Sequence, residues 1–92
     1  MKVIIYDIEK SISALKAIKF IRYHMNISLR EAKDIVDSFR KFDGNETKFI
    51  NEVILDVKEP YIFITNLLNC GVLAKIERKH KINIILNSLN EG

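Results

Sequence analysis

The chain has 92 residues, of which 48% are hydrophobic and 29% charged. This fits one small globular domain and excludes a second, because a second core could not bury enough apolar surface to offset the chain entropy. The apolar runs are too short for a membrane-spanning helix, and Asp7 interrupts the N-terminal one, which argues against a secretory signal. We therefore expect a soluble protein. Its single cysteine, Cys70, cannot form an internal disulfide, which fits the reducing environment of the cytoplasm.

The net charge of +3 is distributed unevenly along the chain. Residues 10–41 contain eight Lys and Arg residues against three acids, whereas residues 42–71 contain two against five. A basic half of this kind indicates an acidic partner surface or a nucleic acid, although solvated helix faces can carry the same pattern.

The first predicted element is a strand at residues 2–9, where β-branched and aromatic residues partly alternate. A helix follows, capped by Ser11 or Ser13 and ending near His24. One arc of this helix is apolar and should face the core: Ala14, Ala17, Ile18, Ile21 and Met25.

The rim of this arc mixes large apolar groups with cations. Going round the helix from Ile18, the order is Arg22, Leu15 and then Lys19. Such a mixture suits protein recognition, because aliphatic contacts supply desolvation energy while cations orient the partner.

The second helix begins almost at once. Asn26 is suited to the left-handed conformation that ends a helix, and Ser28 can accept a hydrogen bond from the Glu31 N–H while the Glu31 carboxylate accepts from the Ser28 N–H. The two helices should therefore form a tight hairpin whose basic faces can merge. The apolar stripe of the second helix comprises Leu29, Ala32, Ile35, Val36 and Phe39. The residues expected towards solvent are Arg30, Lys33, Asp34, Asp37 and Arg40.

The stretch from residue 42 to 57 is predicted to be a loop followed by a strand. Residues 42–48 contain the turn signal Asp43-Gly44-Asn45 and are interpreted as a loop. The strand is indicated by Val53, Leu55 and Val57, which alternate with Ile54 and Asp56.

A third helix is predicted from Tyr61 to Cys70, with Pro60 in its first turn and Gly71 as its left-handed cap. Residues 61–65 could also form a strand, but apolar residues at helical spacing continue to the glycine and favour the helix. A last strand should run from Val72 to about residue 79.

The end of the chain has clean helical spacing. Ile82, Ile85, Leu86 and Leu89 predict a short amphipathic C-terminal helix, and this apolar face could support self-association. We therefore predict an α+β fold of order βααβαβ, with a three-stranded antiparallel sheet covered by helices. Residues 1–80 would form the domain and residues 81–92 an amphipathic extension.

This order of elements resembles the C-terminal domain of the bacterial ribosomal stalk protein, large-subunit protein seven/twelve. The similarity is carried by Ile18-Lys19-Phe20-Ile21-Arg22 and by Leu29-Arg30-Glu31-Ala32-Lys33-Asp34-Ile35-Val36, six residues later. It runs without gaps from about Ala14 to Asp37 and extends over roughly residues 2 to 79.

In that family, the first two helices present a mixed basic and aliphatic surface that recruits translational GTPases to the ribosome. Transferred to matching positions, the resemblance implies a partner-binding surface made of Leu15, Ile18, Lys19, Arg22 and Lys33, with Arg30 on its border.

The chain also departs from the family. Ala14 occupies the family's first basic position, and Asn26 and Ser28 replace its two hairpin glycines. The loop from about Phe42 to Asn51 is longer, and the dimerisation segment and hinge that tether the stalk are missing, so we do not expect a normal stalk subunit. Abundant Ile, Lys and Asn with few Gly and Pro suit an AT-rich genome, such as that of a phage, and a role as a phage regulator of a host process.

The same architecture is also similar to the adaptor that delivers substrates to the bacterial Clp protease. That family grips an N-terminal residue with an acidic Asn-Asp-Asp type of motif after its first strand. The equivalent stretch here is Glu9-Lys10-Ser11, which argues against this function.

Residue patterns for catalysis are missing from the sequence. Neither His24 nor His80 has a Cys, His, Asp or Glu three or four residues after it, so we expect no metal. We interpret His24 as a helix-end residue near the basic face. The three scattered glycines cannot build a phosphate-binding loop, and no serine lies in a nucleophile motif. We therefore expect neither a cofactor nor an enzyme.

The leading hypothesis is a noncatalytic module that binds a protein partner with an acidic surface, such as a translational GTPase. The alternative is a small basic nucleic-acid-binding regulator that uses Lys19, Arg22, Arg30 and Lys33 together with Arg78, Lys79 and Lys81 for phosphates. An ordinary solvated helix face would explain the same side chains. Membrane binding is not expected.

Overall fold

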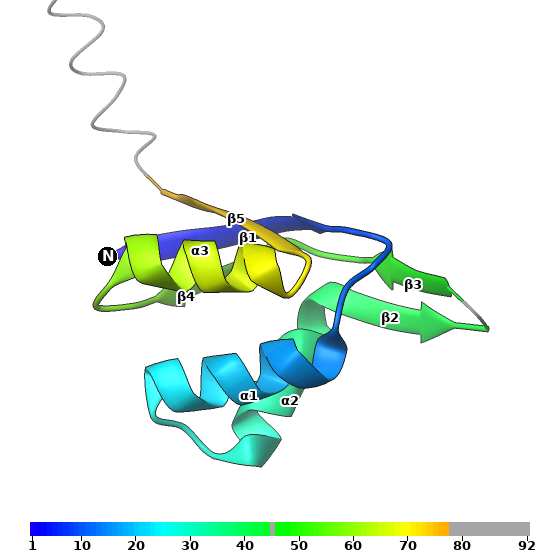
Figure 1. Cartoon of the computed structure of the whole chain (residues 1–92), viewed down its shortest axis with the longest axis horizontal. Helices are drawn as coiled ribbons and strands as arrows, with labels where there is room; N and C mark the ends of the chain where they lie inside the picture. The colour runs from blue at the N-terminus through cyan, green and yellow to red at the C-terminus, as the bar shows by residue number, and fades with distance from the viewer. Residues whose placement is uncertain (45, 78–92) are drawn as a thin grey trace, which may run out of the picture.

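The computed structural model describes residues 1–44 and 46–77, and it confirms the α+β class (Figure 1). The elements in chain order are β1 (Lys2–Ile8), α1 (Ala14–Met25), α2 (Leu29–Phe39), β2 (Arg40–Asp43), β3 (Glu46–Phe49), β4 (Val53–Asp56), α3 (Pro60–Asn69) and β5 (Val72–Ile76). No helix in this part of the chain has the length and apolar character needed to cross a bilayer.

The main sheet has three antiparallel strands, as predicted, and the structure shows their order to be β4-β1-β5. Val3 and Ile5 in the central strand are fully buried, and they pair with Leu55 and Val53 of β4. The pairing of β1 with β5 shifts between Ile5 and Asp7, so the strand carries a bulge there. Alternating apolar residues thus place one face of the sheet against the core.

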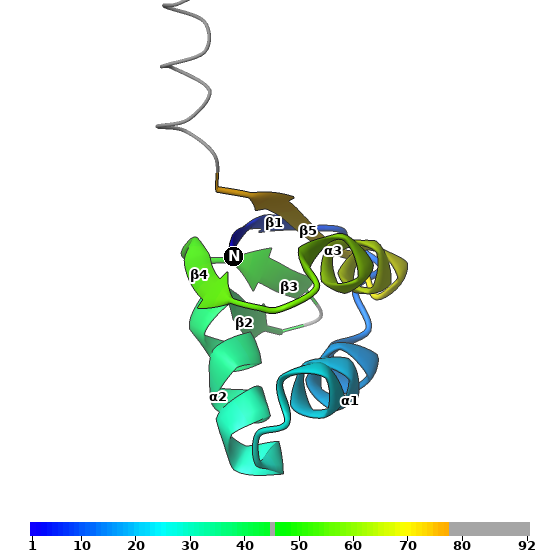
Figure 2. The ribbon, with the colours of Figure 1, turned by 90° about the vertical axis from the view of Figure 1, so that its left-hand side faces the viewer.

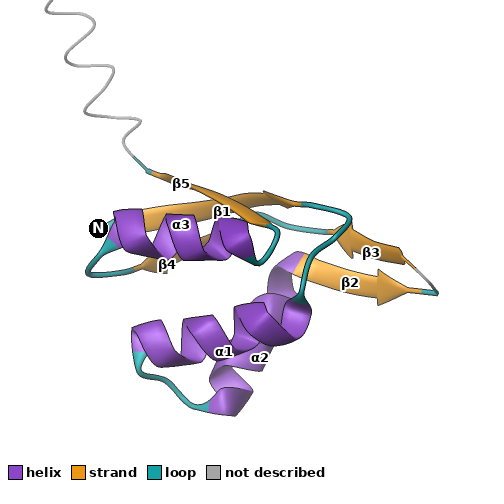
Figure 3. Ribbon diagram, in the orientation of Figure 1, coloured by secondary structure: helices purple, strands orange, loops and turns teal. Residues whose placement is uncertain are grey.

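All three helices lie on that one side of the sheet (Figures 1 and 2). The second, two-stranded sheet of β2 and β3 projects from the end of α2 (Figure 3). The buried residues between the sheet and the helices come from every layer and form one core: Val3, Ile5, Ala17, Ile21, Ala32, Val36, Phe39, Leu55, Val57, Phe63, Leu67, Cys70 and Val72.

The limits of α1 follow the predicted signals. The Ser13 hydroxyl accepts a hydrogen bond from the Lys16 N–H, and Asn26 has left-handed dihedrals of φ 54° and ψ 48°. Ala17 and Ile21 are buried, and the remaining residues of the predicted apolar arc pack against the core from its edge: Ala14, Ile18 and Met25. The predicted orientation of this helix is therefore confirmed.

The start of α2 is capped in a slightly different way from the predicted one. The Ser28 hydroxyl accepts from the Glu31 N–H at 3.1 Å, as expected, but it also donates to the Glu31 carboxylate at 3.0 Å. The Glu31 carboxylate therefore accepts its hydrogen bond from the Ser28 hydroxyl. The donor predicted from the sequence was the Ser28 backbone N–H. Leu29 was predicted in the apolar stripe and is more than half exposed, because it lies at the helix end beyond the core.

The prediction of a loop at residues 42–48 was wrong. Residues 40–43 and 46–49 pair as an antiparallel hairpin in the register Arg40 with Phe49 and Asp43 with Glu46. Gly44 has φ +64° in the connection, so the turn signal was recognised, but the strands on both sides of it were not. Each strand has only four residues, too few for a clear alternating pattern.

Arg40 was predicted towards solvent, and this was also wrong. Its side chain is only 16% exposed, because α2 passes directly into β2 and turns this residue inward. A guanidinium nitrogen of Arg40 lies 3.7 Å from the Asp37 carboxylate, while its buried Nε has no hydrogen-bond partner among the described residues.

The helical interpretation of residues 61–65 is correct, since α3 begins at Pro60. Beyond its end, Gly71 has φ +87°, and a Cβ atom at this position would lie 2.8 Å from the Ile12 Cα. Backbone hydrogen bonds join the same two segments: Glu9 N–H donates to the Gly71 carbonyl at 2.8 Å, and Ser13 N–H donates to the Cys70 carbonyl at 2.9 Å. The connection from β1 to α1 is thus held against the turn from α3 to β5.

β5 ends at Ile76, and its predicted continuation to residue 79 lies outside the described residues. The same holds for His80, for the predicted C-terminal helix with its self-association surface, and for the boundary between residues 1–80 and 81–92.

Replacing Gly71 with alanine should lower the free energy of unfolding by about 2 to 4 kcal/mol, because left-handed strain adds to overpacking against Ile12. The matched control is Gly44→Ala, which meets nothing within 4 Å and should lose only the strain, about 1 to 2 kcal/mol. Chemical denaturation measures both values. Equal losses in the two variants would contradict the proposed close contact.

Replacing Ser28 with alanine should cost about 1 kcal/mol of stability, because the Glu31 N–H and carboxylate both lose their partner. Ser13→Ala should cost less, since the Ser13 cap bond is 3.4 Å long. The same denaturation experiment ranks the two, and a larger loss for Ser13→Ala would show that the α2 cap is not the stronger one.

Candidate functional site

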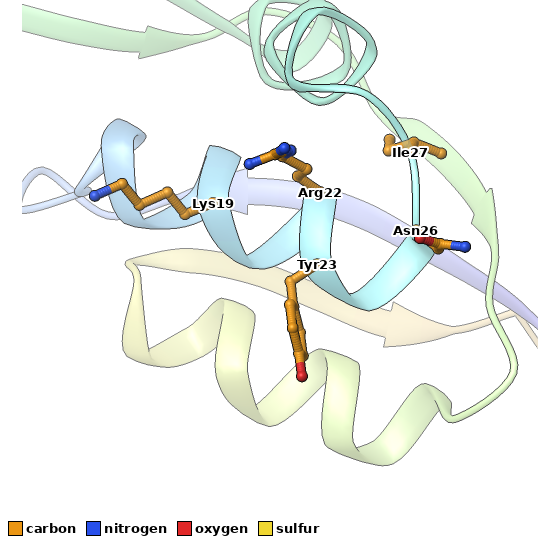
Figure 4. A pocket seen from close by; sticks show the side chains of 5 residues that line it. All are labelled: Lys19, Arg22, Tyr23, Asn26 and Ile27. Atoms are coloured by element: carbon orange, nitrogen blue, oxygen red, sulfur yellow. The ribbon is translucent and has the colours of Figure 1, made fainter.

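An open hollow of about 640 Å³ lies over the exposed end of the hairpin that α1 and α2 form. Two of the predicted site residues, Lys19 and Arg22, line it (Figure 4). Its other lining residues are Tyr23, Asn26 and Ile27. The hollow therefore combines two cations, one aromatic ring, one amide and one aliphatic side chain.

Helical spacing explains how α1 builds this surface. Arg22, Tyr23 and Asn26 follow Lys19 by three, four and seven residues, so each lies near Lys19 round the helix, with Arg22 and Tyr23 on different sides of it. In Figure 4, Arg22 leaves α1 on the side where α2 lies, while Tyr23 points away from Arg22. The side chains thus frame the hollow from different directions.

The turn after α1 closes one end of the hollow. The N–H groups of Asn26 and Ile27 both donate to the Arg22 carbonyl, and the left-handed Asn26 reverses the chain there. Ile27 is half-buried and packs against the core. This turn fixes where the lining from Asn26 and Ile27 stands relative to Arg22.

The other predicted site residues do not line the hollow. Leu15 is 63% exposed and lies one turn before Lys19, and Ile18 is half-buried against the core. Arg30 and Lys33 are exposed on α2, one turn apart along its length. The structure thus brings Lys19 and Arg22 together, with Leu15 beside them on α1.

The opposite side of α1 is fixed by aromatic rings. The His24 ring centroid lies 4.8 Å from that of Phe63 in α3 and 5.4 Å from that of Phe20. His24 lies in the last turn of α1, as interpreted from the sequence, and its half-buried ring is part of an aromatic cluster with α3. Since this cluster orients one side of α1 inward, Lys19 and Arg22 are held outward.

Within the described part of the chain, no acidic side chain pairs with either cation of the hollow. Across residues 1–44 and 46–77, neither Lys19 nor Arg22 forms an ion pair. Of the acids on α2, Asp37 lies 3.7 Å from Arg40, the first residue of β2. The positive charge of Lys19 and Arg22 therefore remains available to a partner.

Tyr23, Asn26 and Ile27 are the lining residues that sequence reasoning did not include in its site. The Tyr23 side chain is 87% exposed, the largest exposed fraction among the large hydrophobic residues described. Its position four residues after Lys19 was a usable signal, since this spacing places both on one helix side. The contributions of Asn26 and Ile27 depend on the chain reversal and have no comparable sequence pattern.

Cys70, the single thiol, is buried at the end of α3 and lies apart from the lining of the hollow. Burial raises the pKa of the Cys70 thiol, and the nearby Lys16 opposes this effect. The thiol is therefore held in its protonated form, which is a poor nucleophile.

The hollow can offer charge, hydrogen bonding, stacking and apolar contact to a bound group. In the described part of the chain, no group of three or more His, Cys, Asp or Glu side chains is arranged to hold a metal ion. The chain matches no family model, no curated protein and no solved structure.

Proposed function

We propose that the protein is a noncatalytic binding module that docks an acidic protein surface through α1 and the start of α2. The observation that carries this proposal is the pair of unneutralised cations, Lys19 and Arg22, beside an open hollow. Arg30 and Lys33 add two exposed cations on α2, where the exposed acids Glu31, Asp34 and Asp37 lie beside them.

The apolar groups around these cations give the surface its binding energy. Leu15 is exposed beside Lys19, and Tyr23 and Ile27 line the hollow itself. Interfaces of this type combine an apolar centre, which gains free energy on desolvation, with charges that orient the partner and accelerate encounter. An acidic protein surface with exposed aliphatic groups is the complementary partner.

The partner class we propose is a translational GTPase. The support is the resemblance of residues 14–37 to the ribosomal stalk domain, in which matching positions bind these factors. A module with the same recognition surface can regulate such a factor by competing for its docking site, which fits the action of a phage regulator on a host process.

Charge reversal tests the docking surface directly. Lys19→Glu, Arg22→Glu and Lys33→Glu should each weaken binding to a purified translational GTPase by about tenfold or more, since like charges then face each other across the interface. Calorimetric titration against elongation, initiation and release factors measures the dissociation constants.

Lys58→Glu is the matched control, because it makes the same charge change at an exposed residue between β4 and α3. This variant should bind almost as well as the original chain. Retention of full affinity by all three hairpin variants, or an equal loss in Lys58→Glu, would remove the hairpin as the docking site. Failure of every factor to bind would remove this partner class.

One observation favours the alternative of nucleic-acid binding. Tyr23 is almost fully exposed beside Lys19 and Arg22, and an exposed ring next to cations can stack on a base while the cations contact phosphates. The further cations of this hypothesis, Arg78, Lys79 and Lys81, lie outside the described residues.

The alternative predicts that a single-stranded oligonucleotide binds and that its affinity falls steeply between low and moderate salt. Tyr23→Ala should then reduce the affinity by about tenfold, because base stacking contributes about 1 to 3 kcal/mol per base. Tyr61→Ala is the matched control, as it removes a second exposed tyrosine from α3. Fluorescence anisotropy decides, and equal effects of the two variants would contradict specific stacking.

A further inference from the structure

The longest stretch of the chain without a charged residue is 60–74, although 29% of all residues are charged. It comprises α3, the turn after it and most of β5. On α3, Tyr61, Ile62 and Leu68 are each at least half exposed. β5 lies at one edge of the main sheet. This side of the molecule is therefore neutral and partly apolar.

The backbone of β5 has an open edge. The Glu77 N–H donates to the Lys2 carbonyl, which fixes the side of the strand that bonds to β1. Every second residue of an antiparallel strand turns its N–H and C=O groups the other way, so those of Val72, Ala74 and Ile76 point away from β1. Within residues 1–44 and 46–77, no strand pairs with this edge. It therefore offers a row of donors and acceptors to another strand.

The side chains of β5 do not block this edge. Sheet edges are commonly protected by proline, by charged side chains or by very short strands. β5 has five residues and no proline, and its single charged residue is Lys75. The Lys75 ammonium lies 5.1 Å from the centre of the Tyr6 ring, so this charge leans over β1 and away from the open edge.

The strand is complementary to a second copy of itself. An antiparallel pair centred on Ala74 places Val72 opposite Ile76 of the second copy, so that all the outward backbone groups find partners. In the same register, Lys75 faces the apolar Leu73 of the second copy. Two identical chains with a net charge of +3 can thus meet here without placing one cation opposite another.

α3 would take part in the same contact, since it packs on β5 and reaches β1 at its margin (Figure 2). With a strand spacing of about 4.8 Å, β5 stands about 2.4 Å and β1 about 7 Å from the two-fold axis of such a pair. Two α3 helices between these limits are about 5 to 14 Å apart, a range that includes the separation of packed helices, about 8 to 10 Å. The second copy thus brings its own α3 within packing distance.

The exposed side of α3 can enter such a contact without leaving its central hydroxyl unpaired. Thr65 lies between the apolar residues of that side, and its hydroxyl donates to the Tyr61 carbonyl at 2.9 Å. Because the single donor of this side chain is used within the helix, its burial costs little free energy.

We propose that two copies of the chain associate through the open edges of their β5 strands, in an antiparallel pair centred on Ala74. The two three-stranded sheets then form one continuous sheet, and the two α3 helices lie side by side on the face that carries the core. The neutral stretch 60–74 supplies both parts of the contact.

The other edge of the sheet, β4, is the competing surface. The corresponding pair centred on Ile54 would place Glu52 opposite Asp56 of the second copy, twice in each dimer. Like charges directly opposite each other destabilise strand pairing. For this reason β5 is the better match for a second copy.

The first test combines sedimentation equilibrium with NMR spectroscopy of the full chain. The contact is smaller than a standard interface of about 1,600 Å², so we expect a reversible dimer with a dissociation constant of about 0.1 mM. In a mixture of differently labelled copies, the Leu73 Hα of one copy should show a nuclear Overhauser contact to the Lys75 Hα of the other, because such pairs bring Cα atoms to about 4.5 Å. A monomer at millimolar concentration, or a dimer without this contact, would overturn the proposal.

Opposite charges at one position provide the second test. Leu73→Lys places a cation opposite Lys75 of the second copy, whereas Leu73→Glu places a carboxylate there. The two dissociation constants should differ by about tenfold, with Leu73→Glu the tighter, because two cross-strand charge pairs change sign in every dimer. Sedimentation equilibrium measures both.

Ile54→Lys and Ile54→Glu are the matched controls, since they make the same changes in net charge at the β4 edge. These two variants should dimerise equally well. No difference between the Leu73 variants, or an equal difference between the Ile54 variants, would overturn the proposal. Circular dichroism reports whether each variant is folded, and the NMR contact in the original chain decides independently if one is not. Neither readout involves the hollow on α1, so failure here leaves the proposed docking function intact.

Discussion

The close approach of Gly71 to the Ile12 backbone determines how the two halves of the fold meet. Only a residue without a Cβ atom fits there, and its left-handed φ of +87° lets the chain reverse from α3 into β5. Hydrogen bonds from Glu9 and Ser13 to the Gly71 and Cys70 carbonyls join the same segments. Because Ser13 also caps α1, this contact sets the point at which that helix begins.

The direction in which α1 faces follows from a second contact. Phe20 and His24 stack with Phe63 of α3, while Ala17 and Ile21 are buried in the core. With that side of the helix fixed, the side carrying Lys19 and Arg22 can only face outward. The candidate surface is therefore a consequence of aromatic and apolar packing. This packing holds the like charges of Lys19 and Arg22 on the outward side of α1.

Most of the fold could be predicted because its signals are local. Ser13, Asn26, Ser28 and Gly71 mark helix ends by their own backbone preferences, and the buried alternation of β1 is visible in the sequence. The β2–β3 hairpin could not be recognised, since its four-residue strands are stabilised by pairing with each other. The stacking of His24 likewise depends on Phe63, which is distant in sequence, and the burial of Arg40 follows from the direct passage of α2 into that unrecognised hairpin. For the candidate site, helical spacing identified Lys19 and Arg22, whereas the hollow between them and Ile27 depends on the three-dimensional course of the turn.

The junction between α2 and β2 has a mechanical consequence. Helix and strand join without an intervening residue, and the Ile50 N–H donates to the Phe39 carbonyl at 3.0 Å, so the base of the hairpin is clamped to the end of α2. The hairpin therefore continues from α2 without a linker, and Phe42 in its first strand is 64% exposed. The same helix end that buries Phe39 in the core thus fixes where this second aromatic residue meets solvent.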